Sequence, residues 1–297
     1  MVVADILHAL RAAVVLRAQL PHTRVQTPTH SICRMVCLSV LLLAPLVALA
    51  ADEPVQPRII GGVDVPVGDY PFTVSIQLSL IPGHFCGGAL ISDREVVTAA
   101  HCYGTSDPTQ LFVVVGRTDL TDPTSGQVRK VIARTIHPLA SAPESLGSYD
   151  FAILELDEPV VGIEPVALAP LDMSLADGET VRALGWGWVN AGDPDSGTSH
   201  LQMVDIPIVD TLICQASHEQ GDPDEPKGTV NPETDICAGD RSASVCFGDS
   251  GGPLLVWHPA RHTYLLAGIV SRGKMDCPSA PGIFTSMMSR TLWETMP

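Results

Sequence analysis

The chain has 297 residues, of which 45% are hydrophobic and 17% are charged, and this composition excludes a disordered protein. Residues 59–297 hold 12 lysines and arginines against 30 aspartates and glutamates, a balance of −18. A phosphate backbone needs a partner of the opposite sign, so this charge excludes nucleic acid as a ligand.

An apolar run, VCLSVLLLAPLVALA, occupies residues 36–50. It is too short for a membrane span, it follows a basic residue, and it ends in small residues around a leucine. These features predict a secretory signal peptide over residues 35–50 with cleavage after Ala50, and hence a secreted, extracellular protein with no stable membrane insertion. The alternative is a signal anchor, which Pro45 within the run disfavours.

The segments on either side of the signal peptide are also informative. Met35 would serve as a translation start, so residues 1–34 are interpreted as a misassigned or alternative N-terminus, and residues 1–50 together as a leader. Residues 51–58 (ADEPVQPR) read as a short acidic propeptide that ends in Arg58, directly before the sequence IIGG. An ordinary loop around Arg58 is the alternative. The mature domain would then cover residues 59–297.

The mature part reads as a series of short strands. Residues 72–78 alternate in polarity with the period of a strand, and short apolar or β-branched runs follow at 111–115, 131–136, 151–156 and 254–257. Pro-Gly and Asp-Pro pairs punctuate these runs, as is typical of an all-β sandwich or barrel. A short helix is expected near the end, over residues 289–294.

Six of the eight cysteines lie in the mature part. An even number in a secreted chain indicates disulfides, although six cysteines allow 15 pairings. Zinc is the alternative, but the mature part contains no C-x-x-C pair with later partners.

Two acidic loops, residues 191–196 and 220–235, suggest calcium as a ligand. Neither contains the D-x-[DN]-x-[DN]-G pattern, so solvated acidic loops are the favoured interpretation. We therefore expect no metal and no cofactor.

A glycine-lined turn, GDSGGP at residues 248–253, carries a serine. Glycine lets the backbone approach a substrate closely, and the N–H groups of Gly248 and Ser250 can point at one spot. Two such donors beside a hydroxyl suit the oxyanion of an acyl transfer. Taken alone, the motif is also compatible with an ordinary turn.

Two further motifs supply what a serine nucleophile needs. A hydroxyl requires a base to take its proton, and the sequence TAAHC offers His101. The sequence YDFAIL offers Asp150, an acid that can orient that base. The order His101, Asp150, Ser250 is that of one known catalytic triad.

Together with the IIGG motif that begins at Ile59, the chain contains four motifs in the order IIGG, TAAHC, YDFAIL and GDSGGP. On these motifs the chain resembles the trypsin/chymotrypsin family of serine endopeptidases, from Ile59 nearly to the C-terminus. The resemblance implies two six-stranded antiparallel barrels with the active site between them. It also implies peptide hydrolysis through an acyl-enzyme, and a zymogen that is cut after Arg58. The new ammonium of Ile59 would then pair with buried Asp249.

The resemblance further implies the roles of single residues. Ser250 would be the nucleophile, His101 the general base and then acid, and Asp150 the residue that holds the imidazole, itself bonded by Ser271. The oxyanion hole would be formed by Gly248 and Ser250. The implied disulfides are Cys86–Cys102, Cys214–Cys237 and Cys246–Cys277. The remaining histidines are interpreted as structural or surface residues: His84, His137, His200, His218, His258 and His262.

The substrate pocket implied by the resemblance has Ser244 at its base, where a trypsin-like pocket carries aspartate. Its walls would be formed by Val245, Ser271, Gly273 and Gly282. An open, uncharged slot favours a large apolar side chain, so we expect chymotrypsin-like cleavage after Phe, Tyr, Leu or Met. The alternative is that Asp276, beside Cys277, turns toward the pocket and attracts a basic residue.

One position departs from the family pattern, because relatives usually carry tryptophan where this chain has Arg272. This substitution leaves open how the subsite next to the primary pocket binds substrate. A secreted binding or inhibitor protein on the same fold is the alternative function, but such members usually lose a triad residue and this chain keeps all three. The expected partners are protein or peptide substrates, a trypsin-like activating protease and protein inhibitors, with the chain itself a monomer.

Overall fold

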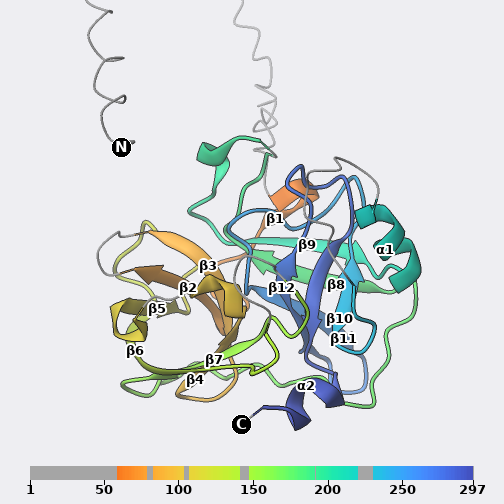
Figure 1. Ribbon diagram of the computed structural model, residues 1–297. Coiled ribbons are helices and arrows are strands. Elements are labelled where there is room, and N and C mark those ends of the chain that lie inside the picture. Colours follow the sequence, from red (N-terminus) through yellow and green to blue (C-terminus); the bar gives the residue numbers. More distant parts are fainter. Residues whose placement is uncertain are drawn as a thin grey trace, which may run out of the picture. The chain divides into compact units, whose positions relative to one another are not determined.

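The computed structural model describes residues 59–78, 83–103, 107–140, 147–190, 192–219 and 230–296 (Figure 1). The predicted leader, the propeptide with Arg58, and residues 220–229 of the second acidic loop lie outside these ranges.

A closed antiparallel barrel forms the first half of the described chain, in orange to light green in Figure 1. Its strand order is β2-β3-β4-β7-β6-β5. The strands are β2 (Thr73–Leu78), β3 (His84–Leu90), β4 (Glu95–Thr98), β5 (Leu111–Val115), β6 (Gln127–Ile136) and β7 (Ala152–Leu156). In β7 the buried residues Ala152, Leu154 and Leu156 alternate with more exposed ones, because successive side chains of a strand point to opposite faces. Closure leaves this sheet without an open edge.

A second sheet, green to blue apart from the orange β1, has the strand order β1-β9-β8-β11-β12-β13-β10 (Figure 1). Its strands are β1 (Val63–Asp64), β8 (Thr180–Gly185), β9 (Gln202–Pro207), β10 (Asp235–Ala238), β11 (Pro253–His258), β12 (Thr263–Arg272) and β13 (Gly282–Ser286). An isolated antiparallel bridge between Ile208 and Ala238 joins the end of β9 to β10. Six strands thus curl into a partial barrel, and β1 adds a seventh at β9. The all-β fold class is confirmed.

Two α-helices accompany the sheets, α1 (Thr211–Glu219) and α2 (Arg290–Glu294). The side chain of Ser289 accepts a hydrogen bond from the Leu292 N–H and so begins α2, within the range that the sequence predicts. Four short 3₁₀ turns complete the described elements: η1 (Ile59–Gly61), η2 (Ala100–Cys102), η3 (Pro108–Gln110) and η4 (Pro194–Ser196). Neither α-helix is long and apolar enough to cross a membrane.

A hydrophobic cluster joins the two sheets. Ala89, Val97 and Phe151 from the first barrel pack in one cluster with Leu184 and Leu255 from the second sheet, and all five are fully buried. Apolar burial contributes about 25 cal/mol per Å² removed from water, so this shared core holds the two sheets against each other. Side chains from both sheets can therefore meet in one fixed site.

Candidate active site

His101 and Asp150 meet at one edge of the first barrel. His101 lies in η2, just after the end of β4, and Asp150 lies just before the start of β7. These two strands are antiparallel neighbours, and Thr98 pairs with Ala152. Because the end of one strand adjoins the start of its antiparallel neighbour, the sheet register itself brings the two residues together.

The carboxylate of Asp150 is buried and holds His101 by two atoms. The backbone N–H of His101 donates to Oδ1 at 2.9 Å, and the ring Nδ1 lies 2.7 Å from Oδ2. Ser271 Oγ donates to the same Oδ2 at 2.7 Å. Burial alone would raise the pKa of Asp150, but the hydrogen bonds and charge of His101, together with the bond from Ser271, outweigh burial and lower it.

Asp150 is therefore an ionised acceptor that fixes the ring orientation of His101. With Nδ1–H donating to a carboxylate, the second ring nitrogen is left to face other groups. An imidazole held in this way can take a proton from a hydroxyl and return it to a leaving group.

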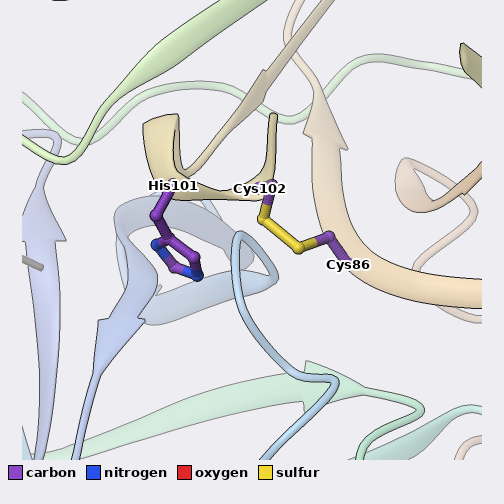
Figure 2. A group of neighbouring side chains, drawn as sticks. All are labelled: Cys86, His101 and Cys102. Carbon is purple, nitrogen blue, oxygen red and sulfur yellow. A yellow bond between two sulfur atoms is a disulfide. The ribbon is translucent and has the colours of Figure 1, made fainter. Parts of the chain in front are cut away.

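A disulfide anchors the turn that carries His101. Cys102, the neighbour of His101, is bonded to Cys86 in β3 (Figure 2). The two sulfur atoms and the imidazole lie within 4.8 Å of one another. Sulfurs bonded to each other offer no thiolate, so this group is a structural brace and not a set of metal ligands. The other pairs are Cys214–Cys237 and Cys246–Cys277, the pairing that the resemblance implied.

The turn of Ser250 is tied to both sheets. The carbonyl of Ser250 accepts from the Gly87 N–H of β3 at 2.7 Å, and the Gly251 N–H donates to Val270 of β12 at 2.7 Å. A Cβ on Gly87 would lie 2.8 Å from the Cα of Gly252, so only glycine permits this approach. The next residue of β12, Ser271, is the one that bonds Asp150, so a single strand holds the turn of Ser250 beside the Asp150–His101 pair.

His101 and Ser250 line one cavity of about 400 Å³, which also exposes Gly248. Gly248 has φ +91°, a left-handed conformation suited to glycine. Within the described part of the chain, the N–H groups of Gly248 and Ser250 donate to no protein acceptor. Two donors kept free beside a hydroxyl can stabilise a developing oxyanion.

Asp249, which follows Gly248, is fully buried. Its two oxygens accept from the Gly187 N–H and the Cys246 N–H, each at 2.9 Å. Burial raises the pKa of Asp249 to about 7 although these two bonds act to lower it. Ile59 is also fully buried, and Ile60 O accepts from the N–H of Ser244, close in sequence to Cys246.

The predicted substrate-pocket residues separate into two groups. Val245, Ser271 and Gly273 line the cavity, and Gly273 has open space where a Cβ would lie. Ser244 and Gly282 are not among the described residues that line it. The side chain of Val245 stands in front of Gly282, because a Cβ on Gly282 would lie 2.9 Å from Val245 Cγ2.

Asp276, the alternative charged residue for the substrate pocket, is not among the described residues that line the active-site cavity. It is exposed, it accepts a hydrogen bond from Ser279 Oγ, and it lines a separate cavity together with Asp240 and Arg241.

Three groups around the site have contacts that sequence reasoning did not predict. His84, interpreted as structural or surface, is half-buried and bonds the carbonyl of Gly248. Phe247 and Phe85 add aromatic wall to the cavity. Arg272 lines the same cavity, but its side chain is only 4% exposed and forms an ion pair with Asp235. No sequence motif marks such a pair, because its members are 37 positions apart.

Comparison with known proteins agrees with this geometry. The trypsin family model matches residues 59–293. The chain is 35% identical to Trypsin 5G1 of Aedes aegypti over 243 residues, which is 80% of this chain and 83% of that protein. It is 30% identical to Serine protease 28 of Mus musculus over 268 residues, which is 86% of this chain and 94% of that protein. A match over most of the chain, on a two-sheet fold with His101, Asp150 and Ser250 gathered at one site, shows that the chain belongs to the trypsin family of serine endopeptidases.

Proposed function

We propose that Ser250 attacks the scissile carbonyl while His101 takes its proton. The tetrahedral intermediate places its oxyanion against the N–H groups of Gly248 and Ser250, and His101 then gives the proton to the leaving amine. In the second half of the reaction His101 takes a proton from water, which attacks the acyl-enzyme, and then returns a proton to Ser250. Asp150 keeps the imidazole in one tautomer and stabilises the imidazolium. The observation that carries this proposal is the two-point hold of Asp150 on His101, at 2.9 and 2.7 Å, beside the cavity that His101 shares with Ser250.

The preferred substrates are peptides and proteins cut after an apolar side chain such as Phe, Tyr, Leu or Met. Val245 lines the cavity, and Ser244, at the position where an aspartate would attract Lys or Arg, is uncharged and 1% exposed. A cation brought against an uncharged, buried wall would lose its hydration without a partner. The position of Asp276, exposed and bonded to Ser279, supports the same preference.

The protein is made as a secreted zymogen. Residues 1–50 form the leader with the signal peptide at 35–50, residues 51–58 the propeptide, and residues 59–297 the protease domain. Cleavage after Arg58 by a separate trypsin-like protease creates the ammonium of Ile59, which pairs with Asp249. Support comes from the burial of Asp249 and the rise of its pKa to about 7, because a carboxylate in such a place is stabilised by a cation. The expected partners are protein substrates, the activating protease and protein inhibitors, and the active enzyme is a monomer.

Replacement of the nucleophile tests the catalytic proposal. Ser250→Ala, cut after Arg58 in the same way as the wild type, should lose about 10⁴-fold or more in kcat. Secretion and melting temperature should stay unchanged, and a covalent serine-directed phosphonate should label only the wild type. Turnover by the cut Ser250→Ala protein at the wild-type rate would rule the mechanism out.

A further inference from the structure

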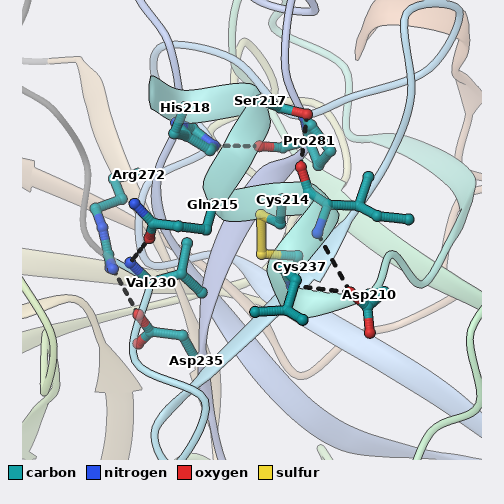
Figure 3. The surroundings of a disulfide bond; sticks show 12 residues. Asp210, Cys214, Gln215, Ser217, His218, Val230, Asp235, Cys237, Arg272 and Pro281 are labelled. Carbon is teal, nitrogen blue, oxygen red and sulfur yellow. Dashed lines mark hydrogen bonds and ion pairs between the residues drawn. A yellow bond between two sulfur atoms is a disulfide. The ribbon is translucent and has the colours of Figure 1, made fainter. Parts of the chain in front are cut away.

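A buried ion pair lies behind the active site. Arg272 is the last residue of β12 and Asp235 is the first residue of β10, and Nη2 of the arginine lies 2.5 Å from Oδ2 of the aspartate (Figure 3). The two side chains are 4% and 0% exposed. The carboxylate also accepts from the Asn231 N–H at 3.0 Å and from Thr234 Oγ1 at 3.3 Å. Burial of two charges is costly unless they are paired and hydrogen-bonded, and Asp235 meets both conditions.

The same guanidinium reaches the catalytic group. Its second arm, Nη1, donates to Ser271 Oγ at 3.3 Å and to the Gly147 carbonyl at 3.5 Å. Ser271 Oγ donates in turn to Asp150 Oδ2 at 2.7 Å, the oxygen that His101 Nδ1 contacts. A continuous chain of hydrogen bonds therefore runs from Asp235 to His101.

The chemistry of the donors gives this chain a direction. A guanidinium has no acceptor, so the oxygen of Ser271 must accept from Arg272. A hydroxyl has a single hydrogen, and with a lone pair engaged by Arg272 that hydrogen is left to point at Asp150. Asp235 binds the opposite arm of the guanidinium and so fixes the plane of the Arg272 side chain. The ammonium of a lysine is not planar and could not be oriented in this way.

We propose that Arg272 and Asp235 are positioning residues for the catalytic triad, acting through the hydroxyl of Ser271. Neither residue acts on the reacting atoms. The pair orients the Ser271 donor, which keeps Asp150 aligned with the imidazole of His101. Because the pair carries no net charge and the Arg272 side chain is only 4% exposed at the cavity, its effect is on orientation, so its loss lowers kcat more than it changes KM. The inference rests on the triad roles proposed above.

A neutral replacement of the whole pair tests this proposal in the full-length protein, cut after Arg58. Removal of one partner alone would leave a buried charge, so the variant is Arg272→Met/Asp235→Leu, since apolar pairs of similar volume often preserve stability. We expect kcat to fall about tenfold, the loss typical of one hydrogen bond to a charged group, with a smaller change in KM. A wild-type kcat in this folded variant would overturn the proposal.

A double-mutant cycle with Ser271→Ala identifies the route of the effect. If the pair acts through the Ser271 hydroxyl, the triple variant loses no more kcat than Ser271→Ala alone. Losses that multiply would show that the pair acts on the site by another route, and the proposal would fall. The triad roles themselves are tested separately by Ser250→Ala, in which remaining activity would contradict them.

The second sheet offers a matched control. Arg182 of β8 and Asp205 of β9 form an ion pair with distances of 2.6 Å, and neither residue lines the cavity. Arg182→Met/Asp205→Leu should leave kcat unchanged. If Arg272→Met/Asp235→Leu does not fold, Arg272→Lys serves instead. It keeps a cation against Asp235 but lacks the second arm of the fork, so kcat should still fall, and unchanged kcat in Arg272→Lys counts against the proposal.

Discussion

His84 donates from its ring Nε2 to the carbonyl oxygen of Gly248, at 2.8 Å and across 164 positions of sequence. A carbonyl only accepts, so Nε2 carries the hydrogen, and Nδ1 is left to accept from Ser75 Oγ at 2.9 Å. The peptide after Gly248 is thereby fixed by a residue of the opposite sheet. Since Gly248 is one of the two proposed oxyanion donors, His84 stabilises the turn on which the proposed chemistry depends.

Removal of this bond should slow catalysis. In His84→Ala the Gly248 carbonyl loses its donor, and the glycine turn can rotate its N–H groups away from the cavity. We expect kcat to fall about 10- to 100-fold, less than the loss of an oxyanion donor itself. Steady-state kinetics on one peptide substrate checks this. Ser75→Ala removes only the hydrogen bond that His84 accepts and should have a smaller effect. A wild-type kcat in His84→Ala would show that the glycine turn keeps its conformation without this bond.

Much of this architecture follows from local sequence signals. The predicted run at 111–115 coincides with β5, and the run at 254–257 lies inside β11. Short apolar or β-branched runs between turn formers favour strands. The helix α2 was predicted at its observed place. The motifs around His101 and Ser250 could be recognised because a residue next to a half-cystine and a glycine turn are local sequence patterns.

The parts that sequence reasoning missed depend on contacts between distant segments. Helix α1 begins at a cap in which Asp210 accepts from the N–H groups of Leu212 and Ile213, yet these two apolar side chains are 80% and 58% exposed. Its apolar pattern therefore does not mark a buried face. The bonds of His84 to Gly248 and of Arg272 to Asp235 are set by sheet packing, and no local pattern encodes either one.

The desolvation of His84 predicts a loss of stability in acid. Desolvation lowers the pKa of His84 to about 4, although its bond to Gly248 acts to raise it. Between about pH 6.5 and 4 the unfolded chain binds the proton and the folded one does not, so stability falls as the pH drops through this window. The full difference is about 3 kcal/mol. Urea unfolding of Ser250→Ala from pH 7 to 4 should show this slope, and adding His84→Gln should flatten it.

Asp249 predicts the opposite dependence in the uncut protein. Its folded pKa of about 7 lies above the ordinary value of 3.8, so the folded state holds a proton that the unfolded state has released. Stability should therefore fall as the pH rises from about 4 to 7, and Asp249→Asn should remove that loss. After cleavage at Arg58 the ammonium of Ile59 should reverse the sign, so that the same variant becomes less stable and poorly active. A cut Asp249→Asn protein with full activity would exclude the proposed switch.

The depth of the substrate pocket should be set by Val245. Its side chain lines the cavity and stands in front of Gly282, while Ser244 is 1% exposed and does not line the described cavity wall. Val245→Gly should therefore deepen the pocket and raise kcat/KM for Phe and Tyr relative to Leu. Full burial of either kind of side chain contributes roughly 1.5–3 kcal/mol, and the ratio changes only by the difference in burial, so we expect a severalfold rise.

The same geometry separates the effects of charge and depth. Ser244→Asp alone should not create a preference for Arg, because Val245 keeps the cation away from the new carboxylate. Ser244→Asp/Val245→Gly should create one, since a buried carboxylate that a substrate guanidinium can reach gains a charged partner.

The measurement is kcat/KM on matched peptides that end in Phe, Leu, Ala and Arg at the cleaved position. The wild type should prefer Phe and Leu, because Val245, Phe85 and Phe247 line its cavity and its buried serine is uncharged. A wild-type preference for Arg would contradict the pocket assignment and direct attention to Asp276, whose replacement by Asn should then abolish that preference.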